Sequence, residues 1–497
     1  MNSAEWISRS MSHWLPSADS LKKMALATAG HTSTAPEVKG SGEPDKKEAP
    51  TVRLTGERLK ATFRRGGEVM SPRQLRSTLE QLRSIVDAQV SEVEGGRRAS
   101  EFARWYAQAK AEERRDCWWL MCEQFAPDAQ LVGAARQRYE AALGTVDEGR
   151  AEMALRLALV SPRARLLQRF AAFKNGVRFL VDLRAQLLPQ VNSDPRLLAL
   201  DGELEGLFST WFDVAFLELR SISWDSPASM LEKLIQYEAV HDIRGWSDLK
   251  NRLGPDRRCY GFFHPRLPNE PLIFVEVALL EALPQAIVPL LDEAAAVVDV
   301  SKATYAIFYS ISNTQRGLRG VSFGDSLIKQ VVETLKHELP QLKVFATLSP
   351  IPGFRAWLTR HADEMLARLD DKAREALTLA LGVPALDQKS VFAAAESVQS
   401  LDEKSPLRQW LLGCAVHYLV EALHDGKPHD PVTRFHLGNG ARLEQINWGG
   451  DFSAKGLKQS YGMMVNYLYD LKRLDTYRTQ FAAGKMAVSS RVRALKL

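Results

Sequence analysis

The chain has 497 residues, of which 45% are hydrophobic and 25% are charged, so its composition is that of an ordinary globular protein. This length predicts roughly two to four domains and excludes a small module that depends on disulfides or metals for stability. The net charge is +5, and the basic residues do not cluster, which argues against a dedicated nucleic-acid binder. The sequence also has no run of about 18 consecutive apolar residues, the length that a membrane span requires.

The cysteines are scattered and lack the paired spacing of a zinc site or a disulfide framework. They are Cys117, Cys122, Cys259 and Cys414. We therefore expect buried thiols in a reducing, intracellular compartment, and no bound metal. The N-terminal segment lacks the apolar core of a secretory signal and resembles a transit peptide only weakly.

Residues 1–70 are predicted to form a flexible N-terminal arm. From Gly30 to Pro50 the only large apolar residue is Val38, amid Gly, Ser, Thr, Pro, Glu and Lys. Such a segment buries too little apolar surface to offset the entropy lost on ordering.

An all-helical domain is predicted for residues 71–189. Ser71 before Pro72 has the pattern of a capped helix start, and Ser161 before Pro162 repeats it. Apolar residues recur at helical spacing after both starts, and the stretch between them is rich in Ala, Leu, Arg and Glu.

Residues 190–497 are predicted to form a mixed domain. Runs typical of β-strands begin at Leu272, Thr304 and Lys343. Between the last two runs, apolar residues at helical spacing indicate a helix that Pro340 ends. The predicted fold class is therefore α+β, with an all-helical N-terminal domain followed by a mixed α/β domain.

The loop before that helix is rich in glycine and arginine. It contains Gly317, Gly320 and Gly324, together with Arg316 and Arg319. Glycines let a backbone approach a ligand closely, and a helix N-terminus favours a phosphate. The spacing matches neither the mononucleotide nor the dinucleotide motif. From these residues alone, a phosphate-binding loop and an ordinary surface turn both stay open.

Two further residues are candidates for chemistry. Ser349 follows the strand at Lys343, and the prolines of its LSPIPGF segment stiffen the backbone. His436 is able to exchange a proton near neutral pH, and it precedes Asn439-Gly440, a dipeptide typical of hairpin turns. A turn or capping serine and a packed histidine are the alternative interpretations.

Taken together, these segments resemble the malonyl-CoA decarboxylase family. The resemblance covers about residues 220 to 470 and rests on ATYAIFYSISNTQRGLRGVSFGDS, LSPIPGF and FHLGNGARLEQINWGGDF, which follow in the expected order. It implies that residues 71–189 serve self-assembly and that residues 190–497 form a catalytic domain resembling the GCN5-related acetyltransferase fold. It also implies an enzyme that cleaves malonyl-CoA into acetyl-CoA and carbon dioxide and needs no cofactor.

The resemblance assigns the catalytic serine to Ser349 and the catalytic histidine to His436, and it places Asn439, Asn466 and Tyr467 near the site. The acyl-CoA loop that it implies consists of Arg319, Gly320, Val321, Ser322, Phe323, Gly324 and Asp325. We expect His436 to protonate the enolate that decarboxylation leaves. Ser349 is expected to bind the substrate carboxylate or to relay the proton.

Two other functions stay open at this point: an acyltransferase that passes the acyl group to an amine, and a non-catalytic acyl-CoA sensor. The expected partner is malonyl-CoA, with no nucleic acid and no membrane, and the resemblance implies a homo-oligomer, specifically a tetramer. The last three residues, LKL, are not the peroxisomal Ser-Lys-Leu signal. We expect a bacterial cytoplasmic protein rather than one of the mitochondrial matrix.

Overall fold

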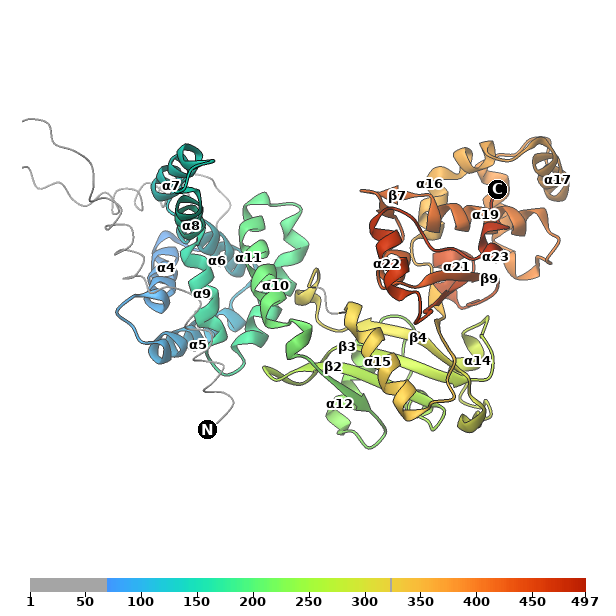
Figure 1. Ribbon diagram of the computed structural model, residues 1–497, viewed down its shortest axis with the longest axis horizontal. Helices are drawn as coiled ribbons and strands as arrows, with labels where there is room; N and C mark the ends of the chain where they lie inside the picture. The colour runs from blue at the N-terminus through green and yellow to red at the C-terminus, as the bar shows by residue number, and fades with distance from the viewer. Residues whose placement is uncertain (1–68, 322–323) are drawn as a thin grey trace, which may run out of the picture. The chain divides into compact units, whose positions relative to one another are not determined.

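The computed structural model describes residues 69–321 and 324–497, and these form two compact units (Figure 1). The helical unit extends to Phe208 and includes the short segment Arg316–Gly320. The sheet unit comprises Ser209–Gln315 and Val321–Leu497. The predicted N-terminal arm lies almost entirely outside the described residues. Among the described helices, none is long and apolar enough to cross a membrane.

The helices of the first unit begin where capping residues are placed. Ser71 accepts a hydrogen bond from the backbone of Gln74 and precedes a proline at the first helical position, and Ser161 caps α9 in the same way. A proline costs nothing at this position because the first amides of a helix have no intrahelical partner. The helices are α4 (Pro72–Val86), α5 (Glu92–Gln108), α6 (Ala111–Gln124), α7 (Ala129–Ala142), α8 (Glu148–Leu159), α9 (Pro162–Ala171), α10 (Gly176–Val191) and α11 (Leu198–Trp211).

Aromatic side chains form much of the core of the helical unit. The rings of Phe170 and Phe179 lie 5.0 Å apart, and Tyr106 packs edge-on against Phe179 at 5.4 Å. The indole nitrogen of Trp118 donates to the Tyr106 hydroxyl at 2.8 Å, which satisfies a polar group that the core would otherwise leave unpaired. The predicted helical domain is therefore present, with its core between α5, α6, α9 and α10.

The helical unit continues beyond residue 189, where the sequence analysis places the boundary. The turn-rich stretch there is short, because Asp194 caps a single 3₁₀ turn, Pro195–Leu197, that leads directly into α11. Turn residues therefore mark a bend between two helices of one unit. The compact unit ends at Phe208, within α11.

The sheet unit is built on a mixed eight-stranded sheet in the order β1-β2-β3-β4-β5-β10-β6, with β9 beside β10. Strands β1 to β4 are antiparallel neighbours, whereas β4 and β5 are parallel and are joined through helix α15. The strands are β1 (Glu218–Ile222), β2 (Arg257–His264), β3 (Leu267–Leu280), β4 (Tyr305–Asn313), β5 (Val344–Thr347), β6 (Ser349–Pro350), β9 (Arg442–Asn447) and β10 (Met464–Leu468). The three predicted strand runs are confirmed as β3, β4 and β5.

Helices and a short hairpin complete the sheet unit. The helix predicted before Pro340 is confirmed as α15, which ends at Glu338. The helices are α12 (Ala228–Tyr237), α13 (Trp246–Arg252), α14 (Val288–Leu291), α15 (Gly324–Glu338), α16 (Phe354–Ala367), α17 (Asp371–Leu381), α18 (Gln388–Ala395), α19 (Pro406–Val420), α20 (Pro431–Gly438), α21 (Ala454–Ser460), α22 (Leu474–Ala482) and α23 (Ser490–Arg493). The hairpin pairs β7 (Leu423–His424) with β8 (Lys427–Pro428).

Strands β4 and β5 part halfway along β4. They pair from Tyr305 to Phe308, whereas β4 continues along β3 as far as Asn313. On the β5 side the chain passes instead into β6, which begins at Ser349 and pairs with β10. The parting therefore brings Ser349 to the place where β4 leaves its parallel neighbour.

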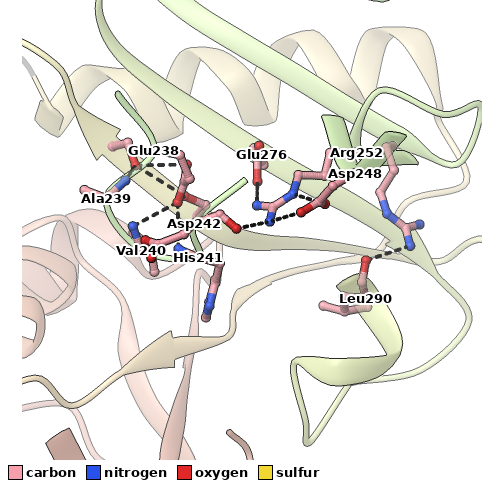
Figure 2. Close-up of polar contacts among 12 residues, drawn as sticks. Glu238, Ala239, Val240, His241, Asp242, Asp248, Arg252, Glu276 and Leu290 are labelled. Atoms are coloured by element: carbon pink, nitrogen blue, oxygen red, sulfur yellow. Dashed lines mark hydrogen bonds and ion pairs between the residues drawn. The ribbon is translucent and has the colours of Figure 1, made fainter. Parts of the chain in front are cut away.

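A buried group of charges lies beside β3 (Figure 2). Arg252 donates to Asp248 at 2.8 Å and to Glu276 at 3.1 Å, and Figure 2 shows its guanidinium between the two carboxylates. Glu238, which accepts from the Ser310 hydroxyl at 2.7 Å, adds a further carboxylate nearby. Burial, and then the charge of Glu238, raise the pKa of Glu276 to about 8. Burial therefore favours the protonated form of Glu276, while the hydrogen bond from Arg252 opposes it.

Candidate active site

Ser349 and His436 come from distant segments and meet in the sheet unit. Ser349 is the first residue of β6, and Val465 of β10 is its partner across the strands. His436 lies in the last turn of α20, a helix that Asp430 caps by accepting from the Thr433 backbone at 2.7 Å. The Ser349 hydroxyl oxygen is 3.1 Å from Nε2 of His436. The two residues that the resemblance assigns to catalysis thus form one hydrogen-bonded pair.

The expected hairpin after His436 is wrong. Asn439 is the C-terminal cap of α20, and its backbone amide bonds to the carbonyl of His436 at 3.2 Å. Gly440 adopts a left-handed backbone with φ of +81°, and a Cβ there would lie 2.4 Å from the Leu474 carbonyl oxygen. An Asn-Gly pair also suits the end of a helix, because both residues tolerate unusual backbone angles. The Asn-Gly pair indicates a turn, and because it follows α20 this turn is a helix end and not a hairpin.

The hydrogen bonds around His436 favour one of its two neutral tautomers. Ser349 donates its hydroxyl hydrogen to Oγ1 of Thr347 at 2.9 Å. With that hydrogen given to Thr347, the serine oxygen is left to accept, which favours the tautomer of His436 that is protonated on Nε2. Nδ1 then accepts from the Tyr469 hydroxyl, 2.7 Å away. The result is a continuous chain of donors from Tyr469 through His436 and Ser349 to Thr347.

The imidazole of His436 is neutral. Its side chain is 3% exposed, and burial lowers its pKa to about 3. The ring stacks on Tyr467 of β10 with centroids 4.5 Å apart. The Tyr467 hydroxyl lies 2.7 Å from the hydroxyl of Thr433, which is on α20 like His436. This packing fixes the plane of the imidazole and leaves its Nε2 edge toward Ser349.

A buried network of amide side chains holds the backbone next to Ser349 in place. Asn466 donates to the carbonyls of Thr347 at 2.8 Å and of Pro284 at 3.2 Å, and its own oxygen accepts from Asn447 at 2.7 Å. Thr347 in turn accepts from the backbone amide of Tyr467 at 3.2 Å. Asn466 and Tyr467 therefore hold the site together, and their polar groups are already occupied.

Asn439 differs from them. Its side chain is 7% exposed, and neither its amide nitrogen nor its amide oxygen has a hydrogen-bond partner within the part of the chain that the structure describes. It follows His436 by three residues, a spacing that puts two side chains on one face of a helix. An unpaired buried amide is costly unless something else binds it. Among Asn439, Asn466 and Tyr467, Asn439 is therefore the residue whose side-chain donor and acceptor are available to a substrate.

The predicted acyl-CoA loop is only partly described. Arg319 and Gly320 are exposed, Gly320 has a left-handed backbone with φ of +92°, and Val321 is buried. Ser322 and Phe323 lie outside the described residues, and Gly324 and Asp325 are the first two residues of α15.

The three glycines of this loop have different positions. Gly320 supplies the unusual backbone angle, and Gly324 begins a helix. Gly317 lies within a 3₁₀ turn, Arg316–Leu318, and a Cβ on it would be 1.9 Å from the Val181 carbonyl oxygen of α10. The close approach that Gly317 permits is therefore made to a helix of its own unit.

Family models match most of the chain. The malonyl-CoA decarboxylase C-terminal domain matches residues 215–497, and the malonyl-CoA decarboxylase N-terminal domain matches residues 125–212. The chain belongs to the malonyl-CoA decarboxylase family. Members of this family are carboxy-lyases.

The chain is similar to members of this family over most of their length. The chain is 36% identical to the mitochondrial malonyl-CoA decarboxylase of Anser anser anser over 399 residues, covering 76% of this chain and 78% of that protein. It is also 36% identical to the mouse mitochondrial protein over 407 residues, covering 78% and 82%. The crystal structure of malonyl-CoA decarboxylase from Rhodopseudomonas palustris is 41% identical, with a TM-score of 0.73 over 86% of this chain and all of that one. The enzyme from Agrobacterium vitis is 39% identical, with a TM-score of 0.74 over 85% and 100%.

Two residues of the hydrogen-bond chain were missed in the sequence analysis: Thr347 and Tyr469. Thr347 stands two residues before Ser349, and Tyr469 two residues after Tyr467. Alternate residues of a strand share one face, so this spacing was an available signal. This signal is weak because alternation within one strand does not show which strands pair. Here β6 pairs with β10, and this pairing brings the segment of Ser349 next to the segment of Tyr467.

Proposed function

We propose that the protein decarboxylates malonyl-CoA, giving acetyl-CoA and carbon dioxide. The observation that carries the proposal is the buried Ser349 and His436 pair in a chain of the malonyl-CoA decarboxylase family. The site offers hydrogen-bond donors and a proton, which is what decarboxylation of a thioester needs. The thioester carbonyl itself accepts the electron pair, so no cofactor enters the proposal.

The proposed reaction conserves charge at each step. The bond between C2 and the carboxylate breaks, carbon dioxide leaves, and the electron pair moves onto the thioester as an enolate. His436 then gives the proton on Nε2 to C2, which becomes the new methyl group. The Tyr469 hydroxyl, bonded to Nδ1, stabilises the ring as that proton leaves, and solvent restores it.

Ser349 and Asn439 are the proposed contacts for the malonyl group. Ser349 is 6% exposed and next to the proton donor, so it binds the carboxylate or orients the thioester against His436. The amide of Asn439, which has no hydrogen-bond partner among the described residues, supplies a further donor for one of the substrate oxygens. A positioned donor to a developing oxyanion contributes about 10²–10³ in rate.

We further propose that the sheet unit is of the GCN5-related acetyltransferase type. The parting of β4 from β5 after Phe308 and the connection from β4 through the glycine-rich loop to α15 support this. In this arrangement the pantetheine arm lies where the strands part, beside Ser349. The exposed Arg316 and Arg319 hold phosphates of the CoA, since charge-assisted hydrogen bonds to phosphate are the stronger ones.

We also propose that the protein assembles as a homo-oligomer through its helical unit. Helix α8 buries none of its residues, and α7 buries only Ala135. The two helices expose Leu131, Met153 and Leu159, each more than half accessible. Exposed apolar side chains on adjacent helices suit a contact with a second copy. Light scattering of the wild type and of Met153→Glu measures this directly, and a monomeric wild type would contradict it.

A deuterium experiment tests the decarboxylation. Malonyl-CoA is supplied in deuterated water without any acceptor, and acetyl-CoA and carbon dioxide are measured together. Equal amounts of both, with one solvent deuterium in the methyl group, are expected. Ser349→Ala and His436→Asn should each lower kcat by about 10²–10⁴ and keep CoA affinity, and the double variant should lose little more. Acetyl-CoA without solvent deuterium would rule out the enolate route.

A further inference from the structure

Asp430 is a buried carboxylate at the start of α20, the helix that carries His436. Its side chain is 0% exposed, and it accepts from the backbone amide of Thr433 at 2.7 Å and from the Tyr418 hydroxyl at 3.5 Å. The Thr433 side chain also hydrogen-bonds this carboxylate. Burying a carboxylate is costly, and serine or asparagine caps a helix about as well. Capping alone therefore does not account for an aspartate at this position.

The hydroxyl of Thr433 connects Asp430 to Tyr467. A threonine hydroxyl has one hydrogen, and when the carboxylate takes it, the oxygen is left to accept from the Tyr467 hydroxyl, 2.7 Å away. The Tyr467 side chain is 0% exposed, and its backbone amide donates to Thr347 at 3.2 Å. Hydrogen bonds at the hydroxyl and at the backbone therefore hold both ends of Tyr467.

The Tyr467 ring in turn restrains the imidazole of His436. The two rings are stacked, with centroids 4.5 Å apart and planes 27° from parallel. The nitrogens of His436 are held by Ser349 at 3.1 Å and by Tyr469 at 2.7 Å. A hydrogen bond weakens only gradually as its angle departs from linear, so these two bonds alone leave the imidazole free to tilt. The stacked face of Tyr467 removes that freedom.

We propose that Asp430 is a positioning residue for His436, and that it acts through the hydroxyls of Thr433 and Tyr467. The proposal rests on the proposed function, in which His436 delivers the proton to C2. All four residues belong to the sheet unit. A proton donor that tilts loses its alignment with the reacting carbon, so the loss falls on kcat and not on substrate affinity. A helix cap without this role would affect stability alone.

Two substitutions test the proposal. Asp430→Ser keeps a capping oxygen and removes the carboxylate, and Tyr467→Phe keeps the stacked ring and removes its hydroxyl. Asp370→Ser is the matched control, because Asp370 caps α17 through the same kind of bond, from the Ala373 amide at 2.7 Å, and α17 carries no residue of the site. For each variant, kcat and KM are measured with malonyl-CoA, and the ring signals of histidine are recorded by NMR in labelled protein.

Asp430→Ser and Tyr467→Phe should each lower kcat about tenfold and keep KM within about twofold, and the double variant should lose little more, because both changes interrupt one path. The ring signals of His436 should move in both variants, as its position over the Tyr467 ring changes. Asp370→Ser should change neither kcat nor these signals. Thr433→Val interrupts the same path and replaces Asp430→Ser where that variant folds poorly.

Unmoved His436 signals in Asp430→Ser and Tyr467→Phe, or losses of kcat that multiply in the double variant, would overturn the role of Asp430. A wild type that does not decarboxylate malonyl-CoA would instead contradict the proposed function, and the NMR signals would still show whether Asp430 sets the position of the imidazole.

Discussion

Replacing Thr347 with valine should disable the proton donor without disturbing the substrate. The threonine hydroxyl is fully buried and accepts the hydrogen of Ser349 at 2.9 Å, which leaves the serine oxygen to accept from Nε2 of His436. Valine has nearly the same shape and no acceptor. The Ser349 hydrogen then turns toward His436, which requires the opposite tautomer and removes the proton that the proposed mechanism delivers to C2.

The size of the effect follows from the bonds that are lost. One neutral hydrogen bond is worth about 0.5–1.5 kcal/mol net, which at about 1.4 kcal/mol per factor of ten shifts the tautomer preference by roughly two- to twelvefold. Thr347 also accepts from the Tyr467 amide, and leaving that buried donor unpaired costs about 1–3 kcal/mol. We expect kcat to fall roughly tenfold or more and KM to stay near the wild-type value, because the hydrogen bonds of Thr347 go to Ser349, Asn466 and Tyr467.

Steady-state kinetics and ¹⁵N spectra of labelled histidine measure the two parts of this argument. The wild type should show His436 protonated at Nε2, and Thr347→Val should shift the signal toward the other tautomer. Thr347→Ser keeps the acceptor and should retain kcat within about twofold. A wild-type turnover rate for Thr347→Val, or an equal loss of kcat in the serine and valine variants, would refute this role of Thr347.

Because His436 is neutral with a pKa near 3, kcat should stay level from about pH 6 to pH 8, and a fall through pH 6.5 would instead indicate an imidazolium donor. Asn439→Ala should lower kcat/KM about tenfold without lowering the melting temperature, since it removes a buried amide that has no partner in the described chain; unchanged kinetics would exclude a substrate contact. Glu276 has a raised folded pKa, so between its unfolded value and about pH 8 the folded state holds a proton that the unfolded state has released. Stability therefore falls as pH rises through this window, and the unfolding free energy of Glu276→Gln should gain on that of the wild type by up to ~1.4 kcal/mol per pH unit. Denaturant unfolding at pH 6 and pH 8 measures this, and a constant difference between the two proteins would show that Glu276 is ionised at both.

Much of the fold could be predicted from local signals. The capped starts at Ser71 and Ser161, the strand runs and the helix before Pro340 all depend on residues within a few positions of one another. Such signals survive in the structure because each concerns a single element. The domain boundary predicted after residue 189 differs from the structure because it also depended on a local signal. A turn-rich stretch indicates a bend in the chain. Whether the next helix packs on the same core depends on residues far away in the sequence.

The site required information of another kind. The residues alone made Ser349 and His436 only two candidates among several, and the family resemblance joined them. In the structure, β10 pairs with β6 and brings Tyr467 and Tyr469 to the same place as α20. Pairing between strands far apart in the chain leaves no local pattern, so the tautomer of His436 and the role of Thr347 emerge only when all four segments are in position.

The neutral state of His436 suits decarboxylation better than a charged one would. The reaction moves negative charge from the malonyl carboxylate to the thioester oxygen, and a cation beside the carboxylate would stabilise the ground state more than the transition state. Burial removes that cation by lowering the pKa of His436. The enolate carbon is a stronger base than a deprotonated imidazole, so a neutral Nε2 hydrogen is acidic enough to be transferred. In the proposed mechanism, the Tyr469 hydroxyl offsets the charge that appears on the ring as Nε2 gives up its proton. The same burial that keeps the site neutral before the bond breaks therefore leaves the proton in place for the step that follows.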